Sequence, residues 1–424
     1  MKAHVRFEHQ LLAVETEHRV HCMLELQAPP APQDRPRPLF HLALVLDRSG
    51  SMAGRKLEVV RECAGFLVRR LAPTDELALI AYDDEVQLLA PLAPVDQSAL
   101  TRAIGRVHPG GQTNLSGGWL KGAEELRRTR GEGPRKILLL TDGLANVGVT
   151  DPEALVAMAR LTAEEQDVGT TTIGFGEDFD EDLLTAMAEA GRGNAHFAET
   201  PDAAPGIFAE ELEGLLSLVA QNVSVEIRPS AEVQLLGILN DFSHVPVPGG
   251  VQIQLGDAYG DEGRRVVFEL HVPELASLGV VEIAEVVLRS TTIGREIAQH
   301  ELRLPLVVNL VAADEAAASE ADREVTEEVI VLTSARAQKQ ARELADRGEF
   351  DEAHEVLSDA AKELRRVAKD SAQAEELAAQ AGMLSESLEM MSPASYDLRA
   401  RKRMSYQSWQ SLQRRKRRQQ QPPP

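Results

Sequence analysis

Leu42-Ala43-Leu44-Val45-Leu46 leads directly into Asp47-Arg48-Ser49-Gly50-Ser51. The aliphatic run has the length and composition of a strand that is buried on both faces, as in the middle of a parallel sheet. One carboxylate and two hydroxyls therefore emerge together at the carboxyl end of this strand. An Asp at a strand end often only caps the next helix, so Asp47 taken alone has two interpretations.

Two further segments bring oxygen ligands to this strand end. Thr113 lies in the glycine-rich loop 110–114, and Asp142 follows a second buried run, residues 136–140. Three hydroxyls and two carboxylates form the candidate site: Asp47, Ser49, Ser51, Thr113 and Asp142. An all-oxygen set of this kind suits a hard cation that keeps several waters. We predict Mg²⁺, with Mn²⁺ as the alternative.

The order Asp-x-Ser-x-Ser, then Thr, then Asp resembles the metal-ion-dependent adhesion site of von Willebrand factor A (VWA) domains, over roughly residues 39 to 219. The resemblance implies that Ser49, Ser51 and Thr113 ligate the metal, and that Asp47 and Asp142 hold it directly or through waters. It also implies a sixth position left for an acidic group of a partner. Hydroxyls add no formal charge, so a metal held largely by them still attracts a carboxylate.

The composition sets limits on the architecture. A chain of 424 residues suggests two or three domains, and its cores must be aliphatic because only 4% of its residues are aromatic. Cys22 and Cys63 lie in apolar segments and are expected to be two buried thiols. We expect a cytoplasmic protein, because the amino terminus lacks a signal-peptide profile and no apolar run has the length of a membrane span.

The pattern along the chain predicts six regions. Buried strands alternate with amphipathic helices over 39–219, which indicates a doubly wound, mostly parallel α/β sheet. If its strand order is 3-2-1-4-5-6, the strands that end at Asp47 and Asp142 are neighbours where the winding reverses. The other predicted regions are the strands of 1–28, a Pro-rich linker at 29–38, a β-sandwich at 220–312, a helical hairpin or bundle at 313–392, and a basic, disordered tail at 393–424. Residues 1–28 have no core partner of their own, so we expect them to join the sandwich, with the VWA domain inserted between its halves.

The charge is distributed unevenly. The net charge is −22, yet residues 399–424 hold nine Arg or Lys and no acid. A solvated tail is one interpretation of this segment. Docking onto the acidic body or an acidic protein, nucleic-acid binding and membrane binding are the alternatives.

The motifs argue against an enzyme. The chain has no P-loop and no Gly-x-Ser-x-Gly, and Asp47 lacks the second Asp that an aspartyl-phosphate phosphatase places two residues on. The leading hypothesis is a cytoplasmic protein-binding scaffold that captures an acidic residue through Mg²⁺, similar to bacterial multidomain VWA proteins. The alternatives are an adaptor of an AAA+ ATPase of the MoxR or chelatase type, and a nucleic-acid-linked protein that acts through its basic tail.

Overall fold

The computed structural model describes residues 1–31, 39–129, 131, 133–176, 179–198, 200, 204–292 and 298–416. Most of the predicted linker at 29–38 and the last eight residues lie outside this described part. The chain divides into two compact units. One unit holds the described residues of 39–218, and the other holds residues 1–31, 219–292 and 298–416.

The 39–218 unit is built on one six-stranded sheet, with the strand order β6-β5-β4-β7-β8-β9. All neighbours are parallel except the antiparallel pair β5 and β6. This order confirms the predicted doubly wound α/β fold and puts β4 beside β7 where the winding reverses. The strands are β4 (His41–Asp47), β5 (Glu76–Tyr82), β6 (Val86–Pro94), β7 (Arg135–Thr141), β8 (Val168–Phe175) and β9 (Arg192–Ala198).

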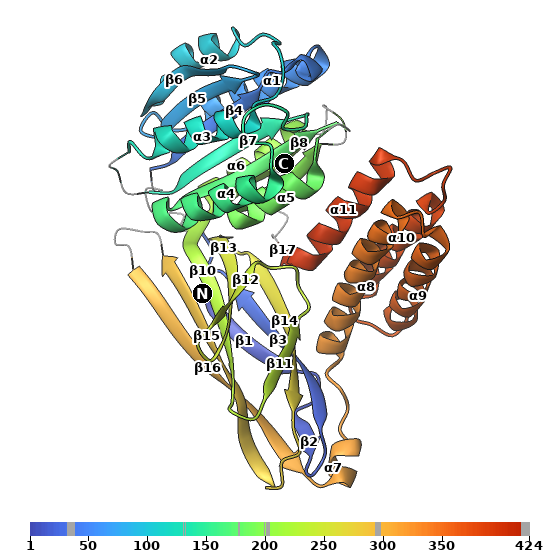
Figure 1. The fold of residues 1–424 in the computed structure, drawn as a ribbon. Helices are drawn as coiled ribbons and strands as arrows, with labels where there is room; N and C mark the ends of the chain where they lie inside the picture. Colours follow the sequence, from blue (N-terminus) through green and yellow to red (C-terminus); the bar gives the residue numbers. More distant parts are fainter. Residues whose placement is uncertain are drawn as a thin grey trace, which may run out of the picture. The chain divides into compact units, whose positions relative to one another are not determined.

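Helices cover both faces of this sheet (Figure 1). On one face, Ala43 and Val45 of β4 pack in a common core with the apolar sides of α3, α4 and α5. On the other face, α1 packs against α2 and α6. The central strands are therefore apolar in consecutive positions, because both of their faces are buried. The helices are α1 (Arg55–Arg70), α2 (Gln97–Ile104), α3 (Leu115–Leu126), α4 (Pro152–Gln166), α5 (Glu181–Ala190) and α6 (Ala204–Leu216).

The second unit contains two sheets that share one core. The first has the order β1-β3-β14-β11, and the second has the order β12-β13-β10-β15-β16-β2. Val20 and Leu24 of β3 meet Val225 of β10 and Val286 of β15 in this core, as in a β-sandwich. The strands are β1 (Lys2–Phe7), β2 (Leu11–Ala13), β3 (His18–Gln27), β10 (Leu218–Pro229), β11 (Gln234–Ile238), β12 (His244–Val247), β13 (Gly250–Tyr259), β14 (Gly263–Val272), β15 (Gly279–Thr292) and β16 (Ala298–Val311).

The strands at the start of the chain lie inside this sandwich. β3 pairs with β14 over ten residues, from Gly263 opposite Gln27 to Val272 opposite His18. The partners of this ladder belong to segments that flank the 39–218 unit in sequence. The 39–218 unit is therefore an insertion between two parts of the sandwich.

Helices follow the sandwich: α7 (Ala313–Ala317), α8 (Arg323–Asp346), α9 (Phe350–Ala368) and α10 (Ala374–Met390). Leu377, Ala381 and Leu384 form the buried side of α10, as their four-and-three spacing predicts. Met23 of β3 packs against Leu332 of α8, which attaches the helices to the sandwich. None of the helices in the described part of the chain combines the length and the apolar character that a membrane span requires.

The prediction of a disordered tail is wrong for residues 398–416. These residues form a fifth helix, α11 (Leu398–Gln413), which lies beside α8, and a two-residue strand, β17 (Arg415–Lys416), paired with β14 (Figure 1). Ala400, Met404 and Leu412 are buried at intervals of four and eight residues, so the helix has an apolar side. Arg414 is also buried, and it is ion-paired with Glu328 and Glu376. Among the predicted alternatives, the structure therefore matches docking onto the acidic body.

Candidate metal centre

Asp47 is the last residue of β4 and is fully buried. Its Oδ1 accepts a hydrogen bond from the Ser49 backbone N–H at 2.7 Å, and its Oδ2 accepts one from the Thr141 hydroxyl at 2.6 Å. A single turn of 3₁₀ helix, Gly50–Met52, then reverses the chain. After this turn Ser49 is buried, whereas Ser51 is exposed as a residue.

Asp142 follows β7 and is also fully buried. Its Oδ1 accepts a hydrogen bond from the Ser51 hydroxyl at 2.7 Å, and its Oδ2 is bonded to the Lys56 ammonium. The Ser49 and Ser51 hydroxyl oxygens are 3.1 Å apart. Four of the five predicted residues therefore form one connected set across two adjacent strand ends.

Thr113 completes the set from the glycine-rich loop. Its backbone N–H donates to Asn146 Oδ1 at 2.8 Å, which ties the loop to the segment after Asp142. A Cβ placed on Gly143 would lie 3.1 Å from the Thr113 hydroxyl and 3.6 Å from the Ser51 hydroxyl. The two hydroxyls thus flank one small space, and glycine at 143 keeps that space open.

The glycines of this loop allow its close approach to the Asp47 segment. Gly110 N–H donates to the Arg48 carbonyl at 2.7 Å, and Gly50 N–H donates to the Gly111 carbonyl at 2.8 Å. A Cβ on Gly110 would lie 1.6 Å from an Asp83 carboxylate oxygen, so a side chain there would displace Asp83. The double glycine therefore fixes where Thr113 enters the site.

The donor set fits a hard cation. The Ser51 hydroxyl gives its hydrogen to Asp142 and accepts the hydrogen of the Ser49 hydroxyl, so one of its lone pairs remains for a metal, and the other ligands are also oxygens. The Lys56 ammonium already rests on Asp142, so a positive charge is accommodated beside this carboxylate. The described residues contain no group of three or more His, Cys, Asp or Glu that could hold a metal, and a centre here depends on hydroxyls. A hard cation would be held by Ser49, Ser51 and Thr113, with Asp47 and Asp142 direct or through waters.

The electrostatics also favour a cation. Burial raises the pKa of Asp47 to about 6, and the charge of Asp142 adds to this effect, whereas the hydrogen bonds from Ser49 and Thr141 oppose it. The protein alone thus stabilises the ionised Asp47 incompletely. A cation between the two carboxylates would lower this pKa again.

Sequence analysis missed three residues of this centre. Thr141 donates to Asp47, Asn146 positions Thr113, and Lys56 contacts Asp142. Thr141 and Asn146 flank Asp142 closely enough to have been considered. Lys56 resembles any lysine near the start of a surface helix, and its sequence position gives no signal of its contact.

Two further residues of this unit have structural roles. Asp180 caps α5 by accepting a hydrogen bond from Leu183 N–H at 2.9 Å. Residues 177 and 178, which precede this cap, lie outside the described residues. Trp119 is fully buried and donates to the Thr170 hydroxyl at 3.1 Å, so it packs in the core.

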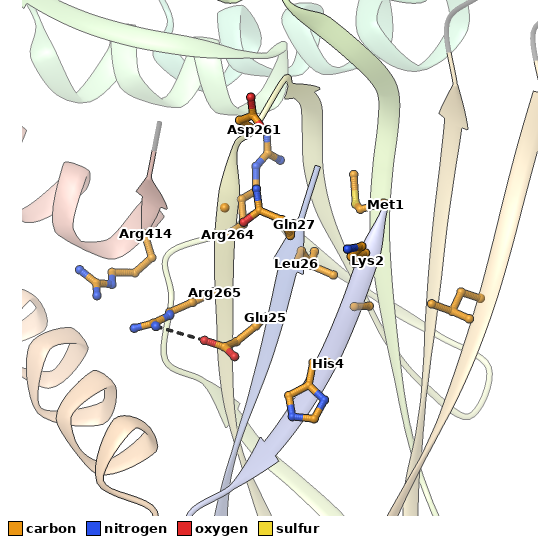
Figure 2. A pocket seen from close by; sticks show the side chains of 13 residues that line it. Met1, Lys2, His4, Glu25, Leu26, Gln27, Asp261, Arg264, Arg265 and Arg414 are labelled. Carbon is orange, nitrogen blue, oxygen red and sulfur yellow. Dashed lines mark ion pairs between the residues drawn. The ribbon is translucent and has the colours of Figure 1, made fainter. Parts of the chain in front are cut away.

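A separate pocket of about 950 Å³ lies in the unit that contains the sandwich (Figure 2). Its walls include Met1 to His4, the end of β3 and the start of β14. Three arginines line it, Arg264, Arg265 and Arg414, and each is ion-paired with protein carboxylates. The protein itself compensates their charges, and we assign no ligand to this pocket.

The fold and the centre together define an α/β domain with a cluster of oxygen ligands at the switch point of its sheet. Residues 41–210 match the von Willebrand factor type A domain. The chain therefore contains a VWA domain, and VWA domains are in general protein-interaction modules.

The curated relatives match parts of this chain. An uncharacterized protein of Synechocystis is 29% identical over 57% of this chain and 59% of its own length. The E3 ubiquitin-protein ligase WAV3 of Arabidopsis thaliana is 28% identical over 56% of this chain and 31% of its own length. The inter-alpha-trypsin inhibitor heavy chain H3 of Homo sapiens is 31% identical over 39% of this chain and 20% of its own length. The chain thus spans less than two thirds of each of these relatives.

Two solved structures resemble the whole chain. A von Willebrand factor type A protein from Catenulispora acidiphila has a TM-score of 0.73 and 18% identity, with 96% of both chains covered. The ArnB paralog VWA2 from Sulfolobus acidocaldarius has a TM-score of 0.61 and 17% identity, with 97% of both chains covered. With TM-scores of 0.73 and 0.61 at identities of 18% and 17%, these matches show a shared fold alone.

Proposed function

We propose that this protein is a metal-dependent interaction module that captures an acidic residue of a protein partner through Mg²⁺ held by Asp47, Ser49, Ser51, Thr113 and Asp142. One observation carries the proposal: three separate segments bring these oxygen ligands together at the switch point of the sheet. Exposure of Ser51 supports access from solvent. Capture of a carboxylate follows from the chemistry of a cation with mostly neutral ligands.

The same geometry favours binding over catalysis. The Ser49 and Ser51 hydroxyls contact each other, and Ser51 also donates to Asp142. Within the described residues, no imidazole contacts either hydroxyl, so neither belongs to a Ser–His pair of the kind that activates a serine nucleophile. We therefore propose a role without turnover. The two buried thiols, Cys22 and Cys63, support a reducing compartment such as the bacterial cytoplasm.

The basic segment contributes little to this proposal. Arg401 is paired with Asp346 at 3.1 Å, Lys402 is buried, and Arg414 is enclosed by carboxylates. A nucleic acid would have to compete with these intramolecular partners. The metal centre is therefore the surface on which we base the search for a partner.

An affinity pull-down from native cell extract tests the function. The wild-type chain is used in Mg²⁺ and in EDTA, beside a variant with Asp47→Ala and Thr113→Ala. We expect a partner that is retained only by the wild type in Mg²⁺. Thr113→Ser is the matched control, because it keeps the hydroxyl and should keep the partner.

The identity of the retained partner distinguishes the remaining options. An AAA+ ATPase would identify the chain as an adaptor of an ATP-driven complex, and another acidic protein would identify a scaffold. Equal recovery of the same proteins in all arms would show that the centre does not bind the partner.

A further inference from the structure

Lys56 is held at the metal centre. It is the second residue of α1, its ammonium contacts Asp142 Oδ2, and its side chain is 24% exposed. A cation in the first turn of a helix is unfavourable, because the helix dipole makes that end positive. The contact with the buried Asp142 carboxylate offsets this cost. The contact with Asp142 therefore holds the lysine at the centre.

The end of β8 leaves room for this ammonium. Gly176 follows β8, and a Cβ placed on it would lie 3.3 Å from Lys56 Cε and 3.4 Å from Lys56 Nζ. Its φ of +75° also favours glycine. The tip of Lys56 is thus packed between Asp142 and the backbone at Gly176.

The charges at the centre depend on this lysine. Among the described residues of the centre, Asp47 and Asp142 contribute two negative charges and Lys56 one positive charge, a sum of one negative charge. The nearby Arg48 is paired with Asp83 at 3.0 Å, and that pair is neutral as a whole. A divalent cation would leave the centre with one net positive charge. Without Lys56, the loaded centre would be neutral.

We propose that Lys56 is a tethered cation that determines the specificity of the centre, weakening metal binding and making the loaded centre select an anionic carboxylate over a neutral ligand. This inference rests on the proposed metal-dependent function. Two effects follow from it. The ammonium repels an incoming metal ion, and it strengthens the attraction of the bound metal for a negative sixth ligand.

Metal titration of the full chain tests the first effect. Mn²⁺ binding is followed by electron paramagnetic resonance, and Mg²⁺ binding by calorimetry. Lys56→Met and Lys56→Gln should bind Mn²⁺ about tenfold more tightly than the wild type, because each removes the repelling charge. Lys56→Gln keeps a hydrogen-bond donor for Asp142 and serves as the second neutral variant if Lys56→Met does not fold.

Two controls isolate the charge at this position. Lys56→Arg keeps the charge and should bind Mn²⁺ as the wild type does. Lys121→Met removes a lysine that pairs with Glu124 at 2.7 Å on α3, so it changes the net charge equally without touching the centre. It should leave the affinity for Mn²⁺ unchanged.

Acetate tests the second effect, with neutral acetamide as its comparison. Acetate should increase Mn²⁺ retention more in the wild type than in Lys56→Gln, and acetamide should change neither protein. Neutral variants that bind Mn²⁺ no more tightly than a metal-binding wild type would overturn this inference and leave the proposed function standing. Absence of Mn²⁺ binding in the wild type and in both neutral variants would overturn both.

Discussion

Asp47 shows how a single buried carboxylate can be tuned for a cation. It lies at the end of β4 with hydrogen bonds to Ser49 and Thr141, yet burial and the charge of Asp142 raise its pKa to about 6. The folded protein therefore holds this proton more tightly than the unfolded chain, in which the ordinary pKa is 3.8. The contribution of Asp47 to stability is fully present below about pH 4 and is lost as the pH rises through about 6.

Asp47→Asn should therefore stabilise the metal-free protein at pH 7.5 by about 2 to 3 kcal/mol, because asparagine cannot become charged. The gain should be absent near pH 4. Denaturant unfolding in EDTA at both pH values measures it, with the exposed helix cap Asp151→Asn as control. Saturating Mg²⁺ should favour the wild type instead. Loss of stability of Asp47→Asn in EDTA at pH 7.5 would contradict this account.

At the residue scale, the residue types and their spacing in the sequence predicted most residues of the candidate metal centre. Asp47 and Asp142 could be placed because each follows an aliphatic strand, and parallel strands end at the same edge. The Lys56 contact could not be placed, because it depends on where the first turn of α1 meets the end of β7. That distance is set by packing and not by local sequence.

At the element scale, α11 shows where charge patterning misleads. The density of Arg and Lys after residue 398 predicted a solvated tail, but Met404 and Leu412 are buried against the other helices and the sandwich. The basic residues are accommodated because the helices and sandwich offer buried acids, such as Glu328 for Arg414. Those acids are distant in sequence, so the segment alone did not reveal its partners.

Met404→Ala should lower the free energy of unfolding by about 2 to 4 kcal/mol, because the methionine is fully buried in the helical core. Gln410→Ala, on the exposed side of α11, should change it by less than about 0.5 kcal/mol. Thermal or denaturant unfolding measures both. If residues 398–413 were a solvated tail, the two substitutions would have equally small effects.

At the scale of the whole molecule, the first strands and the strands after residue 219 form one sandwich. This arrangement was predicted because the two strands in residues 1–28 are too few to form a hydrophobic core of their own. β3 supplies Val20, Cys22, Leu24 and Leu26 to the shared core, and it pairs with β14 along its whole length. The pairing register could not be predicted, because several alternating strands offered similar patterns.

Deletion of residues 1–31 should therefore unfold the sandwich and leave the metal centre intact. Hydrogen exchange should become fast in β14, because it loses its long ladder with β3 and keeps only the shorter ones with β11 and β17, and should remain slow in β4 and β7. Mn²⁺ affinity should change little. Persistent protection of β14 in the shortened chain would show that β3 is dispensable.

The ladder between β3 and β14 also determines the order in which the two units can fold during protein synthesis. When β3 leaves the ribosome, its β14 partner has not yet been translated, and every strand of the inserted domain emerges before residue 263. The inserted domain can complete its own sheet first, because its strands follow one another closely. Until β14 is translated, the edge of β3 that later pairs with β14 has no partner in the ladder, and its apolar side has no core to pack against. The inserted domain can thus be complete before the sandwich can form.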